Sequence, residues 1–126
     1  KTTYLIQQDL NIEKMKQALL IIKDYEDFEA FSKSNTDVKT YLCNIMSCSL
    51  VKKENIIVFR IKANRFLRNM VRAIMGTIVE IGLGKISLQE LHTIIKSKDR
   101  SKAGPSMPAR ALFLIKVEYP SNIKLQ

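Results

Sequence analysis

The fold is decided by the stretch NRFLRNMVRAIMGTIVEIGLG, which occupies residues 64–84. Asn64 is a suitable N-cap, and Gly82 and Gly84 are typical of a helix end. Between them, apolar residues recur at the three- and four-residue spacing that places side chains on one face of a helix. That face consists of Leu67, Met70, Val71, Ile74, Ile78 and Ile81. The stretch predicts an amphipathic helix that packs against another layer of the domain.

Further helices and strands are predicted on both sides of this stretch. Asn11 can cap a helix over residues 12–24, and Ser87 with Glu90 forms a capping box for a helix that ends near Lys98. Residues that favour strands form a hairpin around a polar turn, and strands are also expected near both termini. The expected strands cover residues 4–7, 40–51, 56–61 and 111–119.

The order strand, helix, strand, strand, helix, helix, strand predicts an α+β fold of the ferredoxin-like, split β-α-β kind. In such a fold, helices pack on one face of an antiparallel sheet and leave the other face open. The chain has 126 residues, of which 46% are hydrophobic, and this is enough for one core. We therefore expect residues 1–126 to form a single domain.

The chain carries a formal net charge of +9. A basic domain attracts polyanions, so nucleic acid and anionic membrane surfaces are the first partners to consider, and a soluble basic protein without such a partner is the alternative. The sequence has no run of about 20 apolar residues and no secretory signal pattern. These features argue against a membrane-spanning helix and favour a cytoplasmic location.

Cysteine and histidine, two residue types that often bind metals, are few in this sequence. Cys43 and Cys48 are the only cysteines, and their offset of five residues on a strand would point them to opposite faces, which disfavours a disulfide or a shared metal. Reduced cysteines also fit the cytosol. His92, the only histidine, falls within a predicted helix without a ligand set around it. We expect His92 to have a surface or packing role, and we expect no metal.

Three arginines lie near the start of the second predicted helix. Arg65, Arg68 and Arg72 stand at positions i, i+3 and i+7, which share one side of a helix. Guanidinium groups match phosphate oxygens in pairs and stay charged at any relevant pH, so the three could clamp phosphates. The alternative is an ordinary solvated face of an amphipathic helix.

Two separated blocks of this sequence resemble the C-terminal half of TruA-type tRNA pseudouridine synthases. The first block is NRFLRNMVRAIMG at residues 64–76, continued by EIGLGK at 80–85. The second is DRSKAGP at 99–105, followed by Pro-Ala at 108–109 and Leu-Phe-Leu at 112–114. Asp27, Phe28 and Phe31 resemble an upstream segment of the same family. The resemblance spans about residues 28–119.

The resemblance implies an RNA-modifying isomerase. Members of this family convert uridine to pseudouridine in the anticodon stem-loop region of tRNA, need no cofactor, and act as homodimers. Their catalytic aspartate belongs to an Arg-Thr-Asp motif in the N-terminal half, and no such motif occurs in this chain. Asp37 follows a threonine but lies where the family has no catalytic carboxylate, so we expect a surface residue. The chain alone is therefore expected to be inactive.

The resemblance also assigns candidate site residues. Arg72 matches the arginine that pairs with the catalytic aspartate, and Leu112 matches a residue that lines the pocket for the flipped uridine. A permanently charged partner would keep that aspartate ionised, as the reaction requires. Ala111 departs from the family, which commonly has glycine there. Candidate phosphate contacts are Arg65, Arg68, Lys98, Arg100 and Lys102, unless these are ordinary exposed charges.

Two alternatives to this interpretation remain open. An RNA-binding module of the RRM kind shares the expected element order, but it stacks bases on exposed aromatic side chains, and residues 53–62 offer only Phe59. A piece that serves mainly to build a dimer is the second alternative, and it is compatible with the enzymatic role.

Overall fold

The computed structural model describes residues 10–33, 38–53, 56–107 and 113–118. The expected strand at residues 4–7 lies outside these ranges. The observed helices and strands are α1 (Ile12–Lys23), β1 (Ile45–Lys53), β2 (Ile56–Ala63), α2 (Met70–Gly82), α3 (Leu88–Ser97) and β3 (Phe113–Glu118). Two short 3-10 helices, η1 (Glu29–Phe31) and η2 (Arg100–Lys102), lie in the connections. None of the helices in the described ranges has the length and apolar character needed to cross a bilayer.

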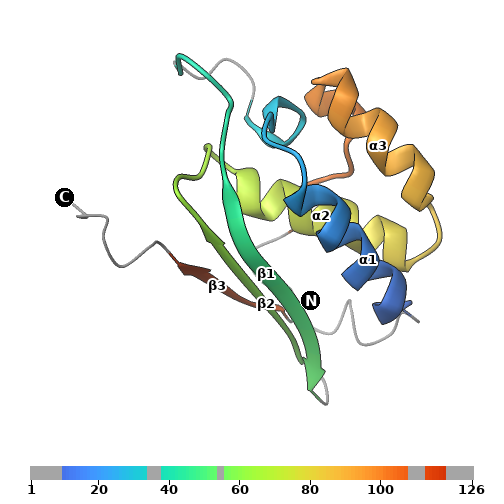
Figure 1. Cartoon of the computed structure of the whole chain (residues 1–126). Coiled ribbons are helices and arrows are strands. Elements are labelled where there is room, and N and C mark those ends of the chain that lie inside the picture. The colour runs from blue at the N-terminus through green and yellow to red at the C-terminus, as the bar shows by residue number, and fades with distance from the viewer. Residues whose placement is uncertain (1–9, 34–37, 54–55, 108–112, 119–126) are drawn as a thin grey trace.

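The described strands form one sheet in the order β1-β2-β3. The helices α1, α2 and α3 lie on the same side of this sheet (Figure 1). The α+β class with helices on one face is thus confirmed. The sheet is mixed rather than wholly antiparallel, because β1 pairs antiparallel with β2, whereas β3 pairs parallel with β2. Parallel neighbours need a long crossover, and α2 with α3 supplies it.

Strand β2 supplies one row of side chains to the core. Ile57, Phe59, Ile61 and Ala63 are buried, while Arg60 between them is exposed, which is the alternation of a half-buried strand. Phe59 is fully buried. It therefore offers no stacking platform for a base, which weakens the RRM-like alternative.

The two cysteines differ from the sequence expectation. Cys43 precedes β1 and is buried, and a bulge between Ile45 and Ser47 shifts the register of β1. The extra residue turns Cys48 back toward α1, where its thiol donates to the carbonyl of Leu19. Both cysteines are free thiols in the structure. The expectation that a regular strand points them to opposite faces was wrong. Burial raises the pKa of both thiols.

The helix caps at α1 and α3 are as predicted. The Asn11 side chain accepts a hydrogen bond from the Lys14 amide at 3.1 Å. At α3, the Ser87 hydroxyl accepts from the Glu90 amide and the Glu90 carboxylate accepts from the Ser87 amide. Both helices begin at the residue after their cap.

The start of α2 was predicted wrongly. The side chain of Asn64 accepts from the Asn44 amide at 2.8 Å and so ties the end of β2 to the start of β1, instead of capping a helix. The helix begins only after Asn69, whose backbone is left-handed with φ 66°. A left-handed residue cannot lie inside a right-handed helix. Arg65 and Arg68 therefore precede α2 and do not share a helix face with Arg72.

Candidate functional site

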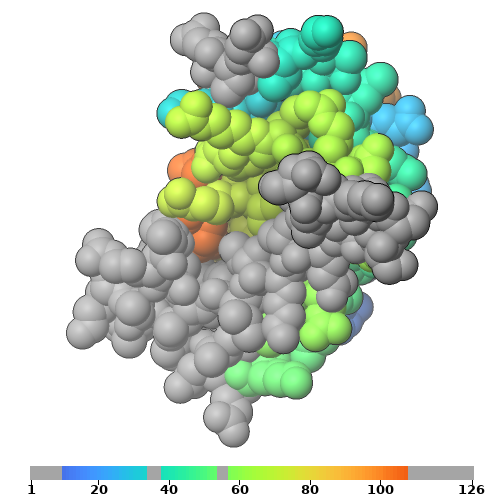
Figure 2. Space-filling view, turned by 90° about the vertical axis from the view of Figure 1, so that its left-hand side faces the viewer, coloured from blue at the N-terminus to red at the C-terminus, as the bar shows by residue number. Residues whose placement is uncertain are grey.

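The candidate site lies where residues 104–107, here called the docked segment, run along the first half of α2. The amide of Gly104 donates to the hydroxyl of the buried Thr77, and the amide of Met107 donates to the carbonyl of Arg72, both at 2.9 Å. Figure 2 shows the beginning of α2 and the segment that follows η2 next to each other on one face. The two blocks of the sequence resemblance, far apart in the chain, thus meet.

The docked segment approaches α2 so closely that Gly76 must be a glycine, and Gly104 lies in a tight contact. A Cβ atom on Gly76 would lie 1.6 Å from the carbonyl oxygen of Pro105. A Cβ atom on Gly104 would lie 3.0 Å from the Glu80 side chain and 3.1 Å from the Thr77 Cα atom. Because the neighbour of Gly76 is a backbone atom, that position has no room for a side chain, whereas a Cβ atom at Gly104 would need its neighbours to shift by a few tenths of an ångström.

Arg72 is the third residue of α2, and its side chain is anchored from one edge. Its Nε atom donates to the carbonyl of Met107 at 2.8 Å, and its own carbonyl accepts from the Met107 amide. Within the described part of the chain, no carboxylate forms an ion pair with Arg72. The side chain is exposed and its terminal nitrogens donate to no group in the described residues, so they can bind a further acceptor.

Two polar side chains, those of Asn69 and Arg100, brace the docked segment beside Arg72. Asn69 Nδ2 donates to the Ser106 hydroxyl oxygen at 2.6 Å, and Arg100 donates to the same oxygen at 2.9 Å. Arg100 also donates to the Gly104 carbonyl at 2.9 Å. Sequence reasoning missed Asn69 and Ser106. Asn69 lies inside the first block of the resemblance, while Ser106 falls between the quoted parts of the second block and gave no signal.

The position of Arg100 depends on the turn that precedes it. The Asp99 carboxylate accepts from the Ser101 amide at 3.0 Å and from the Ser101 hydroxyl at 2.7 Å. These hydrogen bonds lower the pKa of Asp99 and fix the start of η2. Arg100 then points back to the docked segment instead of outward to solvent.

The remaining basic candidates are in different surroundings. Arg65 is half-buried and donates to the carbonyl oxygens of Thr40 and Leu42 at 3.1 and 3.0 Å. Lys98 forms an ion pair with Asp27, with a distance of 3.4 Å between nitrogen and oxygen. Arg68 and Lys102 have exposed side chains. The structure therefore brings Arg72 and Arg100 together at the docked segment, while Arg65 joins two parts of the backbone.

Other candidates fall elsewhere. Leu112 and Asp37 lie outside the described residues. His92 contacts Tyr25, whose hydroxyl is 2.7 Å from His92 Nδ1, which agrees with the expected packing role. In the ranges that the structure describes, no three His, Cys, Asp or Glu side chains are grouped as metal ligands would be.

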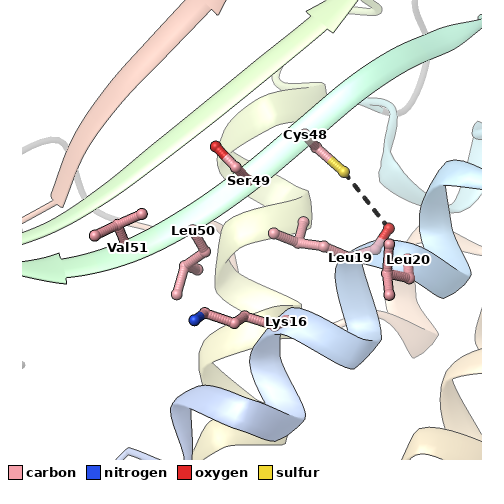
Figure 3. Close-up of a pocket in the computed structure, with 7 residues that line it drawn as sticks. All are labelled: Lys16, Leu19, Leu20, Cys48, Ser49, Leu50 and Val51. Atoms are coloured by element: carbon pink, nitrogen blue, oxygen red, sulfur yellow. Dashed lines mark hydrogen bonds between the residues drawn. The ribbon is translucent and has the colours of Figure 1, made fainter.

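A separate surface feature is an apolar groove of about 350 Å³ between α1 and β1 (Figure 3). Leu19 and Leu20 line it from α1, and Leu50 and Val51 from β1. Lys16 is the only charged residue in its lining. Cys48 and Ser49 complete the lining, and none of the candidate site residues lies in it.

Comparison with known proteins identifies the family of this sequence. A family model described as tRNA pseudouridine synthase matches residues 25–120. The chain is 49% identical over 121 residues to a protein of Bacteroides fragilis named tRNA pseudouridine synthase A, covering 95% of this chain and 48% of that protein. A protein of the same name from Porphyromonas gingivalis is 48% identical over 118 residues, and one from Thermoanaerobacter pseudethanolicus 43% over 114 residues. These matches cover 92% and 90% of this chain and 47% of either relative. The chain thus spans about half the length of these relatives.

Proposed function

The chain belongs to the tRNA pseudouridine synthase family, and we propose that it is the C-terminal domain of an enzyme that isomerises uridine to pseudouridine in tRNA. The observation that carries the proposal is the anchoring of Arg72. One edge of its guanidinium is held by the Met107 carbonyl, and the other nitrogens remain available for a carboxylate from the half of the protein that this chain does not cover. Lacking that carboxylate, the chain supplies only part of the active-site cleft.

The role of Arg72 follows from the chemistry of its partner. A guanidinium at hydrogen-bond distance lowers the pKa of a carboxyl group and fixes the orientation of the carboxylate. An aspartate that must act as a nucleophile or base needs both effects. Because the hydrogen bonds to Met107 fix Arg72 before the aspartate arrives, the pair needs little rearrangement when the two halves meet.

The finer details of the proposal rest on the family resemblance. They are modification in the anticodon stem-loop region, packing of the flipped uridine on Leu112, catalysis without a cofactor, a homodimer and a cytoplasmic location. The net charge of +9 supports a polyanionic substrate such as tRNA. An apolar side chain on the flipped base would offset part of the few kcal/mol that unstacking costs.

The chain alone should produce no pseudouridine in an unmodified tRNA transcript. The expected result follows from the missing Arg-Thr-Asp motif, since Arg72 has no carboxylate to hold. The measurement is a pseudouridine assay on tRNA incubated with the purified chain, with a curated relative such as the Bacteroides fragilis protein as the positive control. Pseudouridine formed by the chain itself would contradict the proposed division of the active site.

Arg68 and Arg65 should respond differently to alanine substitution in the complete synthase. Arg68→Ala removes an exposed charge, so the slope of log tRNA affinity against log salt should fall by about one, with unchanged stability. Arg65→Ala removes hydrogen bonds to two carbonyl groups and should destabilise the protein by about 1–2 kcal/mol.

The two measurements are tRNA titrations at several salt concentrations and urea unfolding of each variant. Each of the two variants is the control for the other. If Arg65→Ala changed the salt slope as much as Arg68→Ala while leaving stability intact, Arg65 would be a phosphate contact and its structural role would be wrong.

A further inference from the structure

The hydroxyl group of Ser106 has an unusual hydrogen-bond pattern. Its oxygen accepts from Asn69 Nδ2 at 2.6 Å and from Arg100 at 2.9 Å. A serine hydroxyl has two acceptor lone pairs and one hydrogen to donate. Both lone pairs are therefore filled, and within the described residues the Ser106 hydroxyl donates to no group. Its hydrogen is directed away from the two nitrogens that hold the oxygen.

The two donors are themselves fixed. Arg100 can only donate, and its second hydrogen bond to the Gly104 carbonyl holds the guanidinium in place. Asn69 occupies the N-cap position of α2, where an asparagine side chain ordinarily accepts from the helix backbone, but it makes no such bond. Its left-handed backbone turns the side chain to Ser106 instead. The Asn69 side chain therefore contacts the docked segment and does not cap α2.

We infer that Ser106 is an RNA-binding residue whose hydroxyl donates a hydrogen bond to a backbone phosphate oxygen of the substrate. The inference rests on the proposed function, because the substrate must be RNA. Phosphate oxygens are acceptors only, which matches a group with just a hydrogen left to offer. The surroundings are cationic, since Arg100 contacts Ser106 itself and Arg72 contacts the next residue, Met107.

The assignment gives Arg100 a different role from that of an exposed phosphate contact. Two of its donors are directed to Gly104 and Ser106, so it acts mainly as a positioning residue that polarises the Ser106 hydroxyl. A hydroxyl group that accepts a hydrogen bond from a cationic donor becomes a stronger donor in its own hydrogen bond. Asn69 is the second positioning residue of the same hydroxyl.

The test compares Ser106→Ala with Ser106→Thr in the complete synthase, with two unmodified tRNAs of different sequence as probes. Ser106→Ala should weaken binding of both tRNAs by about tenfold or more, the low end of the range for a hydrogen bond to a charged group. The salt slope should stay the same, because no charge is removed. Ser106→Thr keeps the hydroxyl and should retain most of the affinity. Unchanged affinity in Ser106→Ala, or a loss confined to one tRNA, would overturn the inference.

The variant Asn69→Gly tests whether Asn69 acts by orienting the Ser106 hydroxyl or by holding the docked segment in place. Glycine adopts a positive φ without strain, so only the Nδ2 donor is lost, and tRNA binding should weaken about twofold to threefold. Hydrogen exchange at the Met107 amide, which bonds to the Arg72 carbonyl, reports whether the docked segment stays in place. Protection should persist in Ser106→Ala and Asn69→Gly. Loss of protection together with affinity would mean that the role is only structural.

The same titration separates failure of the inference from failure of the proposed function. If the unaltered synthase binds neither tRNA, the proposed function fails and the inference with it. If the unaltered synthase binds both and Ser106→Ala binds equally well, the inference alone fails.

Discussion

Replacing Arg72 with alanine in the complete synthase should lower kcat by about a hundredfold or more, the size expected when a charged group beside the reacting centre is removed. The affinity for tRNA should change by less than about threefold, because one phosphate contact at most is lost. The physical reason is the partner aspartate, whose pKa rises and whose orientation is lost when the guanidinium is gone. Single-turnover rates and tRNA titrations measure the two quantities separately.

Arg72→Lys is the matched control for this prediction. Lysine keeps the positive charge, but its compact ammonium lacks the planar fork that donates to the Met107 carbonyl along one edge and to a carboxylate along another. The variant should therefore recover only part of kcat. Equal losses of turnover and tRNA affinity in Arg72→Ala would show a plain phosphate contact and would contradict the proposed pairing.

Gly76→Ala, which adds one methyl group to α2, should strongly destabilise the protein. The new Cβ atom would lie 1.6 Å from the Pro105 carbonyl oxygen, so the docked segment must leave the helix or the helix must shift. We expect a loss of about 3 kcal/mol in the free energy of unfolding, at the upper end of overpacking effects. Activity should also fall, because Met107 then no longer holds Arg72.

Gly82→Ala, in the same helix, is the control for helix propensity. Its Cβ atom would come within 2.7 Å of the Met15 sulphur, which is the flexible part of a side chain and can move. Its cost should be well below that of Gly76→Ala. Urea unfolding of both variants measures the difference, and equal stability of the two would refute the requirement for a close contact at Pro105.

Local signals predicted most of the fold correctly. The caps of α1 and α3 use side chains within three residues of the helix start, so the sequence pattern contains all the interacting groups. The start of α2 was missed because Asn64 bonds to Asn44, twenty positions earlier in the chain. The same limit applies to the bulge at Ile45 and to the parallel pairing of β3, since both depend on contacts with distant strands.

The candidate site was predicted unevenly for the same reason. Arg72 was found because it lies in a motif that resembles a known family, yet its contact with Met107 joins residues 35 positions apart. Arg65 and Arg100 were expected at the surface, and the structure shows their guanidinium groups bonded to backbone carbonyls. The sequence shows which charged residues are present. The tertiary fold decides whether a guanidinium group contacts solvent or bonds to the backbone.

The parallel pairing of β3 with β2 also has a consequence for the order of folding. β1 and β2 are neighbours in the chain and can pair early, whereas α2, α3 and the docked segment separate β3 from its partner β2. Closing such a long loop is slow because its entropy cost precedes the contacts. The last strand, which follows Leu112 in the chain, should therefore be the last part of the sheet to assemble.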